Sequence, residues 1–82
     1  MNIEPIDEPI RVLADFSGGQ CRPLRFHWGS RDYKIDRVNA NWIDRQGASC
    51  TLHYSVQVGD ETYWLHFAAN EVQWRLDKMM SD

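Results

Sequence analysis

Apolar and polar residues alternate along most of this chain, and the alternation is clearest between residues 50 and 68. In the runs 50–58 and 62–67 every second side chain is apolar, which is the period of a strand with one buried face. Gly59-Asp60 separates the two runs and suits a two-residue hairpin turn in which glycine supplies a positive φ. The stretch therefore predicts a β-hairpin.

A loop of only Gly59 and Asp60 determines which residues face each other in this hairpin. Tyr54 then faces Leu65 on the apolar side, and His53 faces His66 on the other side. A slip of one residue would move every side chain to the opposite face, so the agreement of the two apolar sets supports this register.

The remaining chain shows the same alternation in further runs. We expect strands at 10–16, 24–28, 31–44 and 71–78, with turns at 17–20, 29–30, 45–47 and 69–70. In the long strand 31–44 the apolar residues are at odd positions before Asp36-Arg37 and at even positions after it, which predicts a bulge or sharp bend there. Its first half is expected to pair with the second strand and its second half with the fourth.

Two further registers follow from the expected turns. A three-residue loop with Gly47 in the left-handed conformation places Trp42 beside Cys50, on the inner face. A turn at 69–70 places Trp74 opposite Leu65, with Val72 also directed inward.

These elements predict an all-β fold: a single antiparallel six-stranded meander that forms a strongly curved sheet or a small open barrel. We expect one β-domain over residues 10–78, preceded by a loose or docked arm (1–9) that contains Pro5 and Pro9, and followed by a tail (79–82). No helix is available to cover the aromatic face, so the sheet must curl over itself or pair with a second copy. Curling is favoured, and a homodimer is the alternative.

Composition narrows the function classes. The net charge of −3 argues against a general polyanion binder, although a local basic patch is compatible with it. Two cysteines do not form a disulfide framework and indicate reduced thiols in a cytoplasmic protein. The first ten residues lack the pattern of a signal peptide. No segment approaches the roughly 20 apolar residues of a membrane span.

One region carries a resemblance. The run from Pro23 to Ile35, followed by Val38, Trp42 and Trp74-Arg75-Leu76, resembles an uncharacterised bacterial domain family. Such domains occur alone or attached to proteins of the error-prone Y-family polymerase type. The resemblance implies a link to DNA transactions and supplies no catalytic residues.

Candidate catalytic and metal-binding groups do not converge. Opposed His53 and His66 would place their Cβ atoms about 5 Å apart, but zinc sites need three or four protein ligands. Asn39 and Gln73, their expected neighbours, are poor zinc ligands, so we expect a solvated histidine pair without metal. Cys50 points inward and His53 outward, which disfavours a nucleophile and base. The sequence thus favours a protein that is not an enzyme and has no cofactor.

The remaining candidate binding site is the outer face of the sheet. One expected row across it is Arg37, Ser55, Trp64, Arg75, and the next is Asn39, His53, His66, Gln73. A tryptophan exposed between two arginines can stack a base or hold an anion. Alternatively, Arg75 simply packs on Trp64, or the N-terminal arm covers it.

The outer face therefore suggests a small binding domain for nucleic acid or another anionic ligand. The alternative is a protein-interaction or homodimerisation module that uses the aromatic face.

Overall fold

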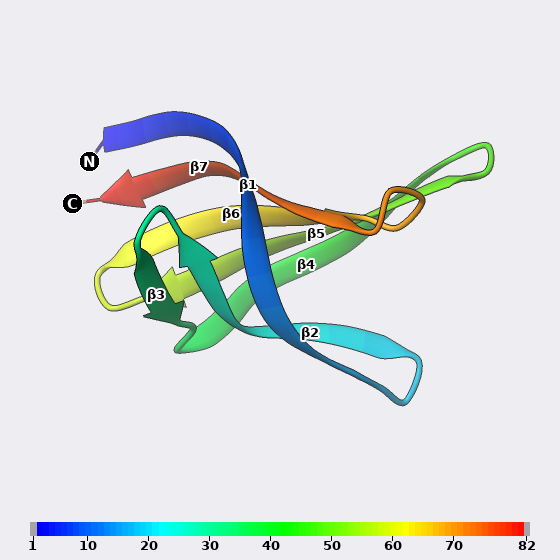
Figure 1. Cartoon of the computed structure of the whole chain (residues 1–82), viewed down its shortest axis with the longest axis horizontal. Coiled ribbons are helices and arrows are strands. Elements are labelled where there is room, and N and C mark those ends of the chain that lie inside the picture. The colour runs from blue at the N-terminus through cyan, green and yellow to red at the C-terminus, as the bar shows by residue number, and fades with distance from the viewer. Residues whose placement is uncertain (1, 82) are drawn as a thin grey trace.

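Seven strands and no helix make up the part of the chain that the structure, a computed structural model, describes (residues 2–81). The strands are β1 (Asn2–Ser17), β2 (Gln20–Trp28), β3 (Arg31–Lys34), β4 (Arg37–Gln46), β5 (Ser49–Val58), β6 (Glu61–Ala68) and β7 (Gln73–Ser81). They form one antiparallel sheet in the order β3-β2-β1-β7-β6-β5-β4. The sheet is so strongly twisted and curved that it makes an open half-barrel (Figure 1). The predicted fold class is thus confirmed.

The number of strands differs from the six expected because the long strand is interrupted. Ile35 and Asp36 leave the extended ladder and separate β3 from β4. The predicted bend therefore lies where the apolar parity changes. As expected, the first half pairs with β2 and the second half with β5. The interruption is large enough to place the two halves at opposite edges of the sheet.

The expected N-terminal arm is instead the first half of β1. Residues 2–10 pair with β7, and residues 11–17 continue into the pairing with β2. Pro5 and Pro9 fit because, among the strands of residues 2–81, this half of β1 pairs with β7 alone, so a proline without an N–H can face the free edge. Residues 79–81, expected as a tail, belong to β7. The paired region thus extends beyond 10–78, and Met1 and Asp82 lie outside the described residues.

The central hairpin has the predicted register at every position. Val58 faces Glu61, Tyr54 faces Leu65 and His53 faces His66. The two-residue turn is confirmed, with Gly59 at a φ of 59°.

The predicted register between β4 and β5 is wrong. The connecting turn contains two residues, Gly47 and Ala48, because Gln46 already pairs with Ser49. Trp42 consequently faces His53. A shift by an odd number of residues exchanges the two faces of a strand, so Trp42 lies on the outer face and is 49% exposed.

The predicted register between β6 and β7 is displaced by two residues. The loop spans residues 69–72, so Trp74 faces Phe67 and its expected partner Leu65 faces Leu76. An even displacement preserves the face, and Trp74 is in the core at 8% exposure. Val72, expected inward, lies in the loop and is 78% exposed.

The inner face of the half-barrel carries the core. Its aromatic rings come from both halves of the chain: Phe26 of β2 stacks on Tyr33 of β3 at 4.9 Å and meets Tyr63 of β6 edge-on at 5.2 Å. The curled sheet therefore buries its own aromatic face, as predicted. The buried apolar residues are Ile10, Phe26, Tyr54, Val56, Tyr63, Leu65, Trp74 and Leu76.

Candidate functional site

The outer face of the sheet presents a row of rings that crosses three strands. Trp42 of β4 faces His53 of β5, which faces His66 of β6. The Trp42 and His53 rings are stacked, with centroids 5.0 Å apart and planes inclined by 6°. The row continues to His66, whose ring centroid is 5.7 Å from that of His53 at an angle of 42°. We call Trp42, His53 and His66 the ring row.

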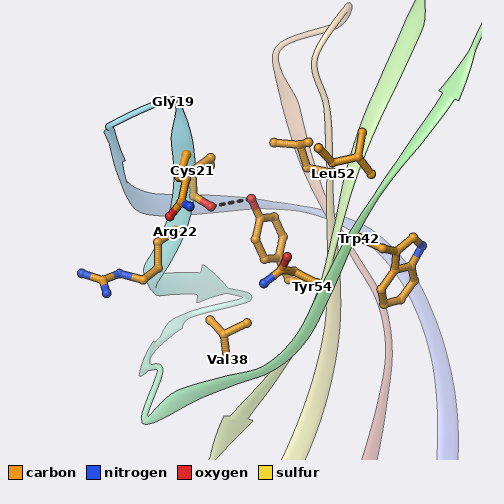
Figure 2. A pocket seen from close by; sticks show the side chains of 10 residues that line it. Gly19, Cys21, Arg22, Val38, Trp42, Leu52 and Tyr54 are labelled. Atoms are coloured by element: carbon orange, nitrogen blue, oxygen red, sulfur yellow. Dashed lines mark hydrogen bonds between the residues drawn. The ribbon is translucent and has the colours of Figure 1, made fainter.

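Trp42 ends the ring row at the edge of the sheet. One face of its indole is covered by His53, and β4 is the last strand in the order, so no strand within residues 2–81 lies beyond it. Figure 2 shows the Trp42 ring on the opposite side of the β4 ribbon from Tyr54. The indole therefore offers a ring face on which another planar group can stack.

Arg75 does not flank Trp64 as expected but faces His66 and reaches across to β1. Its Nε and Nη2 donate hydrogen bonds to Oδ1 of Asp7 at 3.2 and 3.0 Å, and Nη2 also donates to the Asp7 carbonyl at 2.9 Å. The positive charge is thus compensated by a residue of the segment that was expected to form an arm. Asp7 is held for this contact in a β-bulge with a φ of 53°.

Trp64 is half-buried beside a lysine. It faces Ser55, as predicted, but on its other side a bulge in β7 brings Lys78 opposite it. The Lys78 Nζ lies 4.8 Å from the centre of the Trp64 ring, which is a cation–π geometry. Trp64 is therefore already partnered within the chain, and the open indole of this face belongs to Trp42.

Arg37 and Asn39 form a separate polar cluster at the start of β4. The Arg37 Nε donates to Asn39 Oδ1 at 2.9 Å, and the Asn39 Nδ2 donates to Gln57 Oε1 at 3.1 Å. Gln73 lies opposite Ala68, beside the β6–β7 loop. Of the seven predicted site residues, the structure brings together His53, His66 and Arg75 in one row, and places the other four elsewhere on the face.

The histidine pair is close but lacks a set of metal ligands. His66 Nδ1 is 2.7 Å from Asp77 Oδ1, so the carboxylate orients this ring. Within residues 2–81 no three His, Cys, Asp or Glu side chains are grouped so that they could hold a metal ion. The chemistry that the ring row offers is stacking and hydrogen bonding.

Sequence reasoning missed Trp42 and Lys78 as residues of this face. Trp42 was assigned to the core because Gly47 fits a three-residue loop as well as a two-residue turn. Taking Gly47-Ala48 as the turn would have placed Trp42 opposite His53. Lys78 had no such signal, since its position depends on the bulge in β7.

Other features of the described chain contribute little to this site. Cys21 and Cys50 are free, half-buried thiols. Residues 2–81 contain no helix long and apolar enough to cross a membrane. No family model, curated protein or solved structure matches this chain.

Proposed function

We propose that this protein is a small non-enzymatic binding domain that stacks bases of single-stranded nucleic acid on the ring row. The observation that carries the proposal is the stacked pair Trp42 and His53, whose ring planes are nearly parallel, with one indole face open at the sheet edge. Aromatic stacking of this kind accepts any base, because every base has a π-face. The resemblance to domains attached to polymerase-like proteins is consistent with such a ligand.

The charges near the ring row make stacking the main contribution to binding. Lys78 and Arg75 lie on the same face, but Asp7 compensates Arg75 and Asp77 contacts His66. With few free cations to contact phosphates, few counterions are released on binding. We therefore expect modest affinity and a shallow dependence on salt concentration.

Fluorescence anisotropy with labelled oligodeoxythymidylate tests the proposal. Trp42→Ala should weaken binding by about 1–3 kcal/mol, the usual contribution of one stacking platform. Trp42→Phe should retain most of the affinity. Phe16→Ala is the matched control, because Phe16 is also an exposed aromatic (62%) but lies on β1.

Stability must be measured on the same variants. Trp42 is half exposed and makes its ring contact on the outer face, so Trp42→Ala should leave the thermal transition within a few degrees of the wild type. If the oligonucleotide binds Trp42→Ala as well as it binds the wild type, or does not bind the wild type at all, the proposal is wrong.

The proposal extends to a monomer in the bacterial cytoplasm. The aromatic face that could have served a homodimer is buried within one chain, with Phe26 and Tyr63 each 1% exposed. The two free thiols and the bacterial family resemblance support the cellular setting. Light scattering at micromolar concentration should report the mass of one chain, 9.7 kDa. A stable dimer would instead favour the interaction-module alternative.

A further inference from the structure

The half-barrel is open between its two edge regions. β2 and its short neighbour β3 border this opening on one side, and β4 borders it on the other. We call this opening the split. At one end the split is closed, because Ile35 N donates to the Leu24 carbonyl at 3.0 Å and Asp36 N donates to the Gln57 carbonyl at 2.8 Å. Gly59 N also donates to the Asp36 carboxylate at 2.7 Å. The corner between β3 and β4 is therefore fixed to both sides of the barrel.

The other end of the split is bordered by two strand edges without partners. β3 pairs only with Arg25–Trp28, so within the described chain residues 20–23 of β2 have no neighbouring strand on that side. β4 is the last strand in the order, and its second edge faces no strand within residues 2–81. An unpaired edge presents backbone donors and acceptors that can template another strand. On β2 these are few, because the Cys21 carbonyl accepts the Tyr54 hydroxyl and Pro23 has no N–H.

A cavity of about 340 Å³ lies between these two edges. Leu52 and Tyr54 of β5 contribute to it from the inner face, and the Tyr54 hydroxyl donates a hydrogen bond to the Cys21 carbonyl at 2.6 Å (Figure 2). This bond fixes the tip of the β1–β2 hairpin over the cavity. Arg22 of β2 and Ile43 of β4 line it from the two sides.

We propose that this cavity accepts an extended peptide segment of a partner protein, which enters the split as an added strand between β2 and β4. Strand addition obtains affinity from backbone hydrogen bonds and specificity from alternate side chains that point into a cavity. Here alternate side chains of the peptide face Leu52 and Tyr54, and the others face solvent.

A free peptide fits this split better than a second copy of the chain. The β4 strand of a second copy is already paired with its own β5, so it has one free edge. Such a strand could pair with β4 or with β2 but could not bond to both. Only a segment with two free edges completes the sheet on both sides of the split.

The lining determines the chemistry of the peptide. Ile43 is 53% exposed, and together with Leu52 it offers apolar contact to alternate peptide side chains. Arg22 is the only charged residue that lines the cavity, in a chain whose net charge is −3. Arg22 follows Cys21, so its side chain points to the other face of β2, where the Asp15 carboxylate is 3.9 Å away. The split therefore favours a peptide with apolar residues toward the cavity and acidic residues on the other face, near Arg22.

The test uses a synthetic peptide of alternating valine and glutamate, labelled with fluorescein and followed by anisotropy. We expect it to bind, and the matched peptide of valine and lysine to bind at least about tenfold more weakly. Two further versions carry N-methyl groups on alternate residues, one on the odd and one on the even positions. If the peptide pairs with both edges, both versions bind more weakly than the unmethylated peptide, because the odd and even N–H groups of a strand donate to opposite edges.

Variants of the protein locate the binding site. Ile43→Glu should weaken binding of the acidic peptide by at least about tenfold. Leu13→Glu is the matched control, since Leu13 is even more exposed (64%) but lies on β1 outside the cavity lining. Circular dichroism establishes that both variants are folded. The amide of Cys21 and alternate amides of residues 41–45, which face the split, should gain protection from hydrogen exchange when the peptide is bound.

Three results would overturn the proposal. The first is no binding of the acidic peptide to the wild type. The second is binding of both N-methylated versions as tight as that of the unmethylated peptide. The third is self-association of the peptide-free protein that Ile43→Glu abolishes, which would show that a second copy occupies the β4 edge.

Discussion

The hydroxyl of Tyr54 is the contact whose removal tests the architecture of the split most directly. It donates to the Cys21 carbonyl at 2.6 Å and joins two strands that are not neighbours in the sheet. Tyr54→Phe removes one oxygen and leaves the ring contact with Trp74 (5.6 Å between centroids) in place. The substitution therefore isolates the hydrogen bond from the packing of the core.

The expected cost follows from the surroundings of the Cys21 carbonyl. A typical hydrogen bond contributes about 0.5–1.5 kcal/mol net, and leaving a buried acceptor unsatisfied costs about 1–3 kcal/mol. The carbonyl lines an open cavity that water can enter, so the lower range applies. We expect a loss of about 1 kcal/mol, which corresponds to about 4–8 °C in the thermal midpoint of a domain of this size.

Hydrogen exchange separates this local role from a general effect on stability. In Tyr54→Phe the amides of residues 20–22 should exchange faster than the amides of β5 and β6. Tyr63→Phe is the control: its hydroxyl donates to Glu61 at 2.9 Å on the same strand, so the β2 tip should be unaffected. If Tyr54→Phe leaves both the midpoint and the exchange at the β2 tip unchanged, the bond does not hold the hairpin over the cavity.

Two further predictions concern pH and the β6–β7 loop. Burial, followed by the hydrogen bonds to Cys21 and Glu61, raises the pKa of the Tyr54 and Tyr63 phenols above the ordinary value of 10.0. Because the folded state favours the neutral phenols, their contribution to stability is complete below about pH 10 and is lost as the pH rises through the raised pKa values. Urea titrations at increasing alkaline pH should show a falling midpoint of unfolding. An unchanged midpoint would contradict the prediction. In the β6–β7 loop, Val72 has a φ of 50°, a region costly for a β-branched residue, and its side chain is 78% exposed. Val72→Gly should therefore raise the free energy of unfolding by about 1 kcal/mol in the same urea titration. A loss of stability would show that the valine side chain makes a necessary contact.

The sequence alone was sufficient where local chemistry allows one solution. Gly59-Asp60 leaves no room for a longer loop between two matched apolar runs, and the central hairpin has the register that this implies. The apolar alternation likewise identified the inner residues Tyr54, Leu65 and Trp74, because period two distinguishes faces even where the partner is misassigned. The change of parity near Asp36 located the corner between β3 and β4.

Tertiary structure determined the features that depend on a choice between two possible turns or on contacts between segments distant in the sequence. Gly47 fits either a two-residue or a three-residue loop, and only the packing of β4 on β5 selected the turn that directs Trp42 outward. The pairing of β1 with β7, and with it the bond from Arg75 to Asp7, joins residues from opposite ends of the chain. No local pattern encodes such a contact, because it forms only after the sheet has curled and brought its terminal strands together.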